Sequence, residues 1–493
     1  MIKVATINPP FLKNYSRQSR SPSVAKSGTI YYSYYLAYAG AAIESHGHKV
    51  KHIDAISHDL NEDSVLKVIA EFSPSLIIFD TSTPSIVSDI KFASRIKNIL
   101  PNCLLFAVGT FPSKNTIEFQ RLNNKYNAKI IGCLIGEYEE TSVEVANAVA
   151  TGSPINAIEG IVLFDGSPIP EKPQPRKTSA DFLDQIPFVS EFYLRHLQRS
   201  GIEKHFYASI TWPYIQILTA RGCPYKCSFC NIPSIGSYRT RSVDSVISEF
   251  KFIIEKMPFV KEIFIEDDTF PINKKRTIEI CKRIISEKIK IKWSCNARVN
   301  TDLETLQWMK KAGCRLACVG FESPSIDALE GVIKKTSLVE QELFMENANK
   351  AKIKINGCFI LGLPGDTIKS IDNTIEYAKR LMPNTAQFYP HMVYPGTGSF
   401  EWAEKNNLLE HKDWEKWNTP EGFHNTPLKI NGISSANLLQ FADTARKRFY
   451  TNPRYLIKMF FQCIKSPSEL QRILIAGKTF FPLLFGYIFK KNP

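Results

Sequence analysis

The chain has 493 residues, of which 44% are hydrophobic, so it is long enough to build more than one buried core and is not a disordered protein. Its formal net charge of +14 is compatible with a nucleic acid, an anionic membrane surface or a phosphorylated substrate, and does not separate them. The 11 cysteines are spread along the chain, and the N-terminus runs directly into an apolar strand pattern rather than a signal segment. These features exclude a disulfide-built secreted protein and predict a cytoplasmic location.

Residues 1–160 alternate short apolar runs with amphipathic helical patterns. Strands are predicted over residues 2–8, 49–55, 75–81 and 103–110. This βαβ rhythm predicts an α/β domain with a doubly wound parallel sheet. Ligands of such sheets bind at the carboxyl ends of the strands. Here those ends are followed by Ser82 and Thr83, by Gly109, Thr110 and Phe111, and by Gly136, Glu137 and Tyr138.

Residues 161–210 are a predicted proline-rich linker, within which the prolines of residues 165–190 predict a semi-rigid extended connector without helices. A second βα series follows over residues 211–430. Its strands are predicted over residues 215–220, 262–268, 292–297, 316–322, 355–365 and 385–393. About six parallel strands with intervening helices predict a partial (β/α)6 barrel. Residues 431–493 have no strand rhythm and predict a helical C-terminal region.

The sequence CPYKCSFC places Cys223, Cys227 and Cys230 in C-x3-C-x2-C spacing directly after a predicted strand. Three thiolates on one short loop can bind three irons of a [4Fe-4S] cluster. Electron-transfer clusters use four cysteines, so a trio leaves one iron open to chelate a small molecule. Gly222 and Pro224 let the backbone wrap closely around a bound object.

Two other interpretations of the cysteines were considered. Structural zinc normally has four ligands in paired spacing, but no Cys or His lies between Cys230 and Cys281. Three unrelated core cysteines would not concentrate on a loop that contains Pro and Gly. The cluster interpretation is therefore favoured over both.

CPYKCSFC resembles the C-x3-C-x-aromatic-C signature of the radical SAM superfamily, with Phe229 in the aromatic position. The resemblance implies a radical SAM enzyme whose catalytic and metal-binding residues are Cys223, Cys227 and Cys230. It also implies that the cluster cleaves S-adenosylmethionine (SAM) to a 5′-deoxyadenosyl radical. The motifs that follow in family order are SCNAR, GFES and CFILGLPGDT, and the SAM-binding residues they imply are Tyr225, Phe229, Asn296, Arg298, Glu322, Gly362, Leu363 and Pro364. Each later motif alone is also compatible with a tight turn or a helix cap.

Residues 1–160 resemble the cobalamin-binding domain that precedes the barrel in one branch of this family, and EDDTF at residues 266–270 is typical of that branch. The resemblance implies that cobalamin binds at Ser82, Thr83, Gly109, Thr110, Phe111, Gly136, Glu137 and Tyr138. No D-x-H-x-x-G motif occurs, so histidine ligation of cobalt is not expected. The alternative is a domain that has lost its cofactor and only shapes the substrate cavity.

From Arg446 to Pro493 the sequence has ten Lys and Arg residues against one acid, interleaved with aromatic residues. This composition predicts peripheral membrane contact through residues 446–493. The alternative is that these helices pack on the barrel and their lysines are merely solvated. Binding of single-stranded RNA is disfavoured because radical SAM methylthiotransferases carry an N-terminal cysteine trio, whereas only Cys103 and Cys133 precede the loop here. No nucleic acid partner is expected.

Over most of its length the chain resembles the group that contains anaerobic magnesium-protoporphyrin cyclase and hopanoid-associated radical SAM proteins. The resemblance implies methylation, cyclisation or rearrangement of an unactivated carbon in a lipid-like or polycyclic isoprenoid substrate. It also implies an electron donor such as flavodoxin or ferredoxin, and a cytoplasmic enzyme peripheral at the inner face of the membrane. The alternatives are a soluble natural-product or peptide substrate, a tRNA methylthiotransferase-like enzyme, and a non-catalytic zinc-binding interaction protein.

Overall fold

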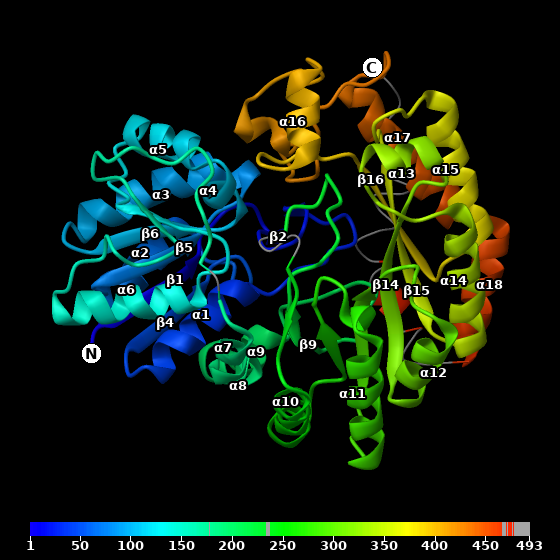
Figure 1. Cartoon of the computed structure of the whole chain (residues 1–493), viewed down its shortest axis with the longest axis horizontal. Coiled ribbons are helices and arrows are strands. Elements are labelled where there is room, and N and C mark those ends of the chain that lie inside the picture. Colours follow the sequence, from blue (N-terminus) through cyan, green and yellow to red (C-terminus); the bar gives the residue numbers. More distant parts are fainter. Residues whose placement is uncertain (177, 233–236, 466–469, 471, 476, 478–493) are drawn as a thin grey trace.

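The computed structural model describes residues 1–176, 178–232, 237–465, 470, 472–475 and 477. Two six-stranded sheets form two lobes that lie side by side, and the chain passes from the first lobe to the second near its middle (Figure 1). The predicted α/β class, with a parallel-sheet domain, a second strand series and a helical end, is confirmed.

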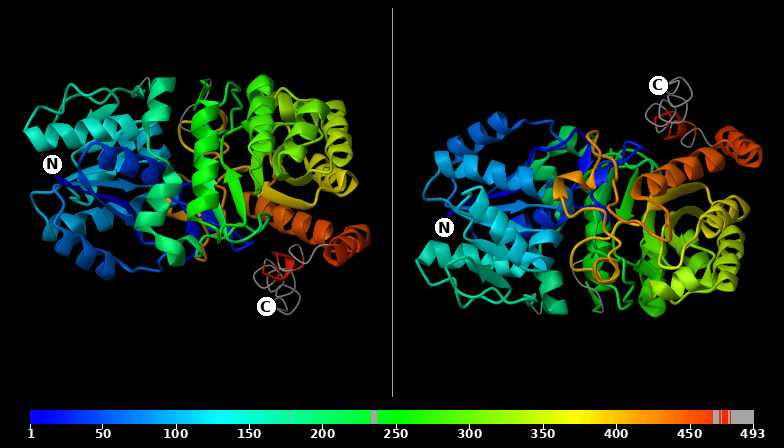
Figure 2. Two further views of the ribbon diagram at one scale, coloured as in Figure 1. Left: turned by 90° about the horizontal axis from the view of Figure 1, so that it is seen from below. Right: turned by 90° about the horizontal axis from the view of Figure 1, so that it is seen from above.

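The N-terminal sheet has the strand order β4-β1-β5-β6-β7-β8, in which only the β7–β8 pair is antiparallel. Its strands are β1 (Lys3–Asn8), β4 (Lys49–Asp54), β5 (Leu76–Asp80), β6 (Leu104–Val108), β7 (Gly132–Leu134) and β8 (Ile161–Leu163). Helices α1 (Tyr34–Ser45), α2 (Glu62–Phe72), α3 (Ile86–Ile99), α5 (Thr116–Lys125) and α6 (Glu139–Thr151) cover both faces (Figure 2). Central strand β5 is buried throughout, as a sheet covered on both sides requires.

Residues 9–33 leave the N-terminal sheet after β1 and extend toward the second lobe. They include the short pair β2 (Tyr15–Ser16) and β3 (Ser23–Val24). Arg17 in this segment forms a fully buried ion pair with Asp89 of α3, with 2.8 Å between Nη2 and Oδ1. An unpaired buried charge would cost several kcal/mol. This pair therefore fixes the segment to the first lobe.

The second sheet is parallel, and its strands follow chain order. They are β9 (Tyr214–Ile217), β12 (Glu262–Ile265), β13 (Lys292–Ala297), β14 (Cys314–Glu322), β15 (Lys354–Leu361) and β16 (Thr385–Pro390). The main connecting helices are α10 (Val243–Lys256), α11 (Lys274–Ser286), α12 (Leu303–Lys311), α14 (Leu338–Ala351) and α15 (Ile368–Leu381). The predicted partial (β/α)6 barrel is confirmed, and all six carboxyl ends share one rim.

The prediction that residues 165–190 contain no helix is wrong, and the linker of residues 161–210 is helical in its second half. That half contains α7 (Ala180–Gln185), α8 (Val189–His196) and α9 (Gln198–Ile202). The dense prolines end at Pro175, so the backbone N–H groups that a helix needs are available afterwards. Ser179 caps α7 by accepting a hydrogen bond from the backbone N–H of Phe182. Helix α8 contacts α1 and α10 and so lies between the two lobes.

The remaining elements complete the rims and the C-terminal part. They are η1 (Thr83–Ser85), α4 (Thr110–Lys114), η2 (Phe270–Ile272), α13 (Ile326–Gly331), α16 (Gly398–Lys405), η3 (Trp414–Trp417), α17 (Ser435–Tyr450) and α18 (Pro453–Lys465). Helix α17 packs on β16, so the helical prediction after residue 431 is confirmed where the chain is described. Residues 478–493, which carry part of the predicted membrane segment, lie outside the described residues. Within the described part of the chain, none of the helices has the length and apolar character needed to cross a bilayer.

Candidate functional site between the two sheets

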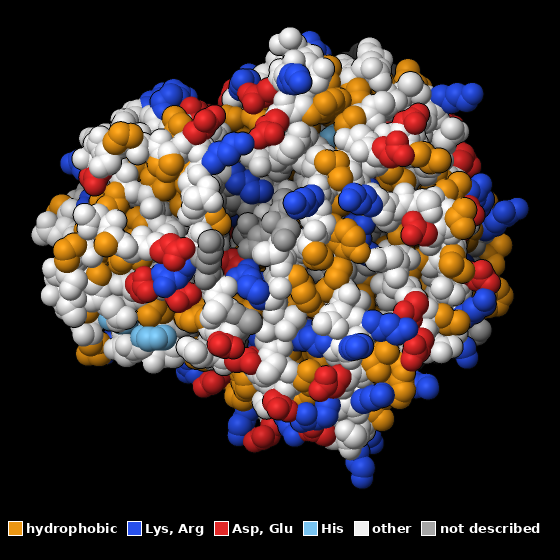
Figure 3. Space-filling view, viewed as in Figure 1, with side chains coloured by type: hydrophobic (Ala, Val, Ile, Leu, Met, Phe, Trp, Pro, Cys, Tyr) orange, Lys and Arg blue, Asp and Glu red, His pale blue; other side chains and the backbone are white. Residues whose placement is uncertain are grey.

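The carboxyl ends of both sheets face a common region between the lobes. Two ion pairs cross this region. Arg221 pairs with Glu139, and Arg239 pairs with Glu137 with 2.7 Å between Nη2 and Oε1. The Arg221 and Glu139 side chains are buried, with 4% and 5% of their surface exposed. In the space-filling view, Lys and Arg side chains gather around a hollow between the lobes (Figure 3). The strand-end loops of both sheets therefore belong to one site.

The cysteine loop begins after β10 (Ala220–Arg221), which pairs antiparallel with β11 (Arg239–Thr240). Cys223, Cys227 and Cys230 lie between these strands, and none of them is in a disulfide. The middle of the loop is held at Ser228, whose N–H donates to the carbonyl oxygen of Val332 at 3.0 Å. Its own carbonyl accepts from the N–H of Ser399, also at 3.0 Å. The loop is thus fixed at its base and its centre.

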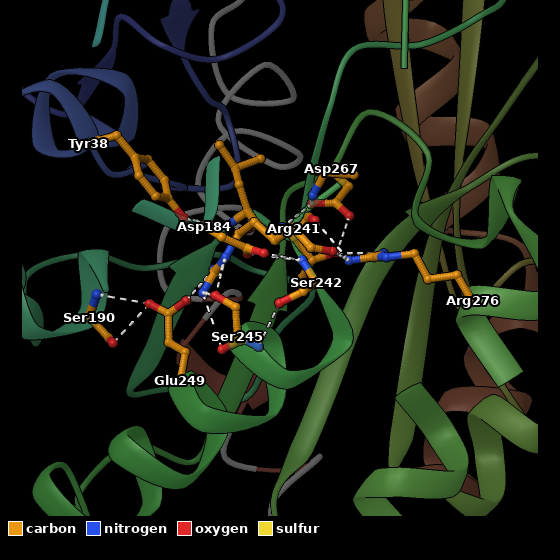
Figure 4. A network of polar contacts seen from close by, with 12 residues as sticks. Tyr38, Asp184, Ser190, Arg241, Ser242, Ser245, Glu249, Asp267 and Arg276 are labelled. Carbon is orange, nitrogen blue, oxygen red and sulfur yellow. Dashed lines mark hydrogen bonds and ion pairs between the residues drawn. The ribbon is translucent and has the colours of Figure 1, made fainter. Parts of the chain in front are cut away.

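A polar network behind the loop fixes the chain that enters it (Figure 4). Asp267 accepts hydrogen bonds from the backbone N–H groups of Thr219 and Ala220 at 2.6 and 3.0 Å. Arg276 donates to the carbonyl oxygens of Thr219 and Arg241, at 2.9 and 3.0 Å. Arg241 in turn is ion-paired with fully buried Glu249. These contacts leave the segment before Cys223 little freedom to move.

The donor set of the loop fits a multi-iron cluster. Among the described residues, no three His, Cys, Asp or Glu side chains gather closely enough to hold one metal ion. A cubane takes one thiolate per iron, so its ligands need not converge on one point. Burial raises the pKa of Cys230 to about 12 and also raises the pKa of Cys223, so ionised thiolates there need a cation. Iron would supply that charge.

Arg298, which follows β13, lies against the cysteine loop. Its guanidinium is 3.7 Å from the ring centroid of Tyr225, and Nη1 is 3.8 Å from the sulfur of Cys227. Asn300 donates to the Tyr225 hydroxyl at 2.7 Å, and Asn296 donates to the Asp267 carbonyl at 3.0 Å. The structure therefore places Tyr225 and Arg298 in contact, whereas Asn296 binds the backbone of Asp267 just after β12.

Glu322 ends β14 in a strained conformation. Its φ of 66° lies in the left-handed region, which is uncommon for a residue with a side chain. The carboxylate is buried and ion-paired with Lys334 at 2.8 Å. A Cβ on Gly320 would lie 2.1 Å from Oε1 of Glu322, so only glycine leaves room for this pair. Strain of this kind persists where surrounding contacts hold it, and it often marks a ligand site.

The loop after β15 carries the remaining predicted SAM residues. The N–H groups of Gly362 and Leu363 both donate to Asp366 Oδ2, at 3.0 and 2.9 Å. Leu363 is buried beside Ala328 and Val332 in a small apolar cluster on which Phe229 packs. Pro364 follows in the same turn, against Gly331. The predicted residues from three strand ends thus surround the cysteine loop.

A cavity of about 180 Å³ lies between the first sheet and the cysteine loop. Four residues predicted to bind cobalamin line it, namely Gly109, Thr110, Gly136 and Tyr138. The other four lie elsewhere. Ser82 accepts or donates a hydrogen bond with Tyr15, Thr83 is buried in η1, Phe111 packs against Trp414, and Glu137 pairs with Arg239.

Several residues of the site carried no clear signal in the sequence. Asp80, Lys114 and Asn231 line the cavity, and burial raises the pKa of Asp80 to about 7 and lowers that of Lys114 to about 8. Arg20 reaches across from the first lobe to Glu266 at 2.8 Å and Asp268 at 3.3 Å. Arg20 and Glu266 are 246 positions apart, so no local pattern could have paired them.

The chain was compared with known proteins. Residues 217–378 match the family model described as the Radical SAM superfamily. An uncharacterized methyltransferase of Pyrococcus horikoshii is 31% identical over 434 residues, which cover 87% of this chain and 89% of that protein. The anaerobic magnesium-protoporphyrin IX monomethyl ester cyclase of Rubrivivax gelatinosus is 24% identical over 433 residues, covering 86% of this chain and 74% of the cyclase.

Among solved structures, the chain is similar to the cobalamin-dependent S-adenosylmethionine radical enzyme OxsB with aqua-cobalamin and S-adenosylmethionine bound. The TM-score is 0.69 at 15% identity, and the match covers 96% of this chain and 72% of that chain. At this level of identity the similarity concerns the fold. It extends over both lobes, so the arrangement of the two sheets is shared as well.

The Glu322–Lys334 pair yields a testable prediction. Replacing Lys334 with Met would leave the Glu322 carboxylate buried without its partner, which costs about 3–5 kcal/mol and would displace it. SAM affinity, measured by equilibrium dialysis on reconstituted protein, should fall at least tenfold while iron content stays normal. Lys335→Met, at the exposed neighbouring lysine, is the control and should bind SAM as the unmodified protein does. Equal affinity of the two variants would contradict a role for the pair.

Proposed function

The chain belongs to the radical SAM superfamily, and from this premise we propose that it is a cobalamin-dependent methyltransferase acting on an unactivated carbon. One observation carries the proposal. The cavity lined by Gly109 and Gly136 of the first lobe is also lined by Asn231 and Asp268, which flank the cysteine loop. A group bound at the first sheet would therefore lie next to a group bound at that loop.

In this proposal Cys223, Cys227 and Cys230 hold a [4Fe-4S] cluster, and SAM binds beside it. When bound, these two groups supply a carbon-centred radical, and cobalamin supplies a transferable methyl group. Arg298, stacked on Tyr225, places a fixed positive charge beside the cysteine loop. Glu322 offers a carboxylate whose position Lys334 fixes. Asp366 holds the Gly362–Leu363 turn against the apolar cluster, which helps to exclude water from the site.

The residues around the small cavity fit one edge of a corrinoid. Gly109 and Gly136 have φ values of 114° and 73°, and a Cβ on either would meet atoms less than 3 Å away, so both must be glycine. Asp80, Lys114 and Asn231 also line the cavity; here Asp80 accepts from Gln18, and Lys114 donates to Asn231, so amide side chains of the ring would share or replace these contacts. The described lining residues of this cavity include no histidine. At about 180 Å³ the cavity is smaller than usual ligand sites, so a corrinoid would also occupy its open mouth.

Anaerobic turnover tests the proposed reaction. Reconstituted protein supplied with cobalamin, SAM and a reductant such as flavodoxin should form both 5′-deoxyadenosine and S-adenosylhomocysteine when substrate is present. 5′-Deoxyadenosine alone would instead favour cyclisation or rearrangement, the second candidate reaction, which the similarity to the cyclase supports. Cys223→Ala should lose iron and both products, whereas Cys463→Ala, on α18, should retain them. Product formation by Cys223→Ala would contradict the assignment.

We further propose that the enzyme works at the surface of a membrane on a lipid-like substrate. Helix α18 supports this, because five of its apolar side chains face solvent. Leu456, Ile457, Phe460, Phe461 and Ile464 are each between 52% and 65% exposed. Arg454 is an exposed basic residue on the same helix, whereas the Lys458 ammonium donates to the carbonyl of Met382. An exposed apolar face beside a basic residue is typical of helices that lie in a membrane interface. A soluble natural product or a peptide is the alternative substrate class.

Vesicle binding tests the membrane proposal. The full chain should co-sediment with vesicles of anionic phospholipid, and binding should weaken as salt is raised because charge attraction contributes. Replacing Phe460 and Phe461 together with Ser should weaken binding at least about tenfold, because buried apolar area is lost. Ile117→Ser removes a similarly exposed residue on α5 and should have no effect. Equal binding by the two variants would contradict the proposed role of α18.

A further inference from the structure

A second cavity lies beside the barrel, and its inner end reaches the strands of the second sheet. This inner end is lined by Asn356 of β15, by residues 385–390 of β16 and by residues of the segment 19–31. All of these residues are among those that the structure describes. Ser19 lines the 180 Å³ cavity as well. A molecule bound at the inner end would therefore adjoin the site between the two sheets.

Strand β16 turns Gln387 toward the interior of the barrel. Phe388, the next residue, lies on the outer face, where its ring centroid is 6.0 Å from that of Phe449 on α17 and 5.3 Å from that of Phe359 on β15. Successive side chains of a strand point to opposite faces, so Gln387 lies on the inner face. Its register partner Cys358 lies on the same face, because the Cys358 thiol donates to Gln387 Oε1 at 3.8 Å.

The side-chain amide of Gln387 is only half satisfied. Its Oε1 accepts hydrogen bonds from the Tyr389 hydroxyl and from the Cys358 thiol, and these contacts fix the orientation of the amide. Among the described residues, none accepts a hydrogen bond from Gln387 Nε2. Branched apolar side chains usually fill the interior of such barrels. An oriented amide without an acceptor, in the wall of a cavity, is instead suited to a ligand oxygen.

The polar groups near this end of the cavity are neutral or paired with one another. Burial lowers the pKa of His424, which lines the cavity, to about 4, so its ring is uncharged. Lys26 and Arg446 both pair with Asp443, and Glu421 also acts on Lys26, whose pKa it raises. Two cations are thus balanced by two acids. This balance favours a neutral ligand group over an ion.

Strand register places Gln387 close to the predicted SAM-binding pair. Gly320 of β14, Cys358 of β15 and Gln387 of β16 are in register across three neighbouring strands. Gly320 lies directly against the carboxylate of Glu322 and the ammonium of Lys334. Neighbouring strands are about 4.8 Å apart, so the backbone of Gln387 lies about 10 Å from Gly320. A group held by Gln387 would therefore lie within one small molecule's length of this pair.

We propose that Gln387 binds the substrate inside the barrel by donating a hydrogen bond from Nε2 to a neutral carbonyl oxygen. The proposal rests on the proposed function for the chemistry done on the substrate. It adds a polar group that the substrate carries near the reacting carbon, and the residue that recognises this group. The apolar remainder of the molecule would extend past Leu439 of α17 and Met459 of α18, which line the outer part of the cavity.

Binding of prodan to the full reconstituted chain tests the proposal. Prodan is a neutral naphthalene ketone whose emission moves to longer wavelength when its carbonyl accepts a hydrogen bond. The reference probe is the same molecule with a methylene group in place of the carbonyl. Gln387→Leu should weaken prodan binding about two- to tenfold, because the carbonyl loses its donor, and should leave binding of the reference probe unchanged. The emission of bound prodan should move to shorter wavelength.

A second variant and a control complete the test. Gln387→Glu keeps an acceptor for the Tyr389 hydroxyl but replaces the donor with an oxygen, so it should also weaken prodan binding, and it decides the question if Gln387→Leu does not fold. Thermal unfolding shows which variants are folded. Gln307→Leu, at an exposed position of α12, should change neither probe.

The two possible failures are distinguishable. Unchanged affinity and emission of prodan in a folded Gln387 variant, or equal weakening of both probes, overturns the proposal. The assay needs neither SAM nor reductant, so its failure leaves formation of 5′-deoxyadenosine intact. Loss of turnover in protein that binds prodan as expected counts against the proposed function alone.

Discussion

Buried ion pairs across the lobe interface hold the two sheets with their carboxyl ends together. The Arg221 guanidinium lies over the rings of Tyr35 and Tyr38, 4.8 and 4.7 Å from their centroids, and pairs with Glu139. Arg239 also pairs with Glu137, and Arg20 makes a third crossing to Glu266. Removing one partner of such a pair leaves a charge buried without compensation, so these contacts strongly disfavour separation of the lobes. Every loop of the site depends on this arrangement.

The positions of the site residues are set by the carboxyl ends of the parallel strands in both sheets. The barrel rim presents the cysteine loop after β9, Arg298 after β13, Glu322 at β14 and the Gly362 turn after β15. The first sheet presents Gly109 and Gly136 from the opposite side. Rigid elements hold the backbone at each position. The backbone of Glu322 is strained, and the ion pair of its carboxylate with buried Lys334 helps to hold it in that conformation. A reactive radical requires a site of this kind, because loose positioning would allow side reactions.

Local patterns in the sequence were sufficient to predict the two sheets and the loop at the centre of the site. The strand and helix rhythm predicted both sheets, and the spacing of Cys223, Cys227 and Cys230 identified the loop around which the other predicted residues gather. Of the eight residues predicted at the strand ends of the first sheet, four line the cavity: Gly109, Thr110, Gly136 and Tyr138. The failures have physical causes. Prolines were taken to exclude helices beyond the point where they end, and Glu137 pairs with Arg239 rather than lining the cavity beside the first sheet. Arg20, Lys334 and the Lys26–Asp443–Arg446 cluster depend on contacts between distant segments, which no spacing rule encodes.

The central claim is that one metal centre on the cysteine loop and one at the first sheet meet between the lobes. Anomalous diffraction from crystals of the anaerobically reconstituted protein with cobalamin, recorded at the iron and cobalt absorption edges, tests it most directly. The account predicts iron at Cys223, Cys227 and Cys230, and cobalt at the mouth of the cavity lined by Gly109 and Gly136. Cobalt elsewhere in the molecule, or a cysteine loop without iron in protein that turns over SAM, would contradict it.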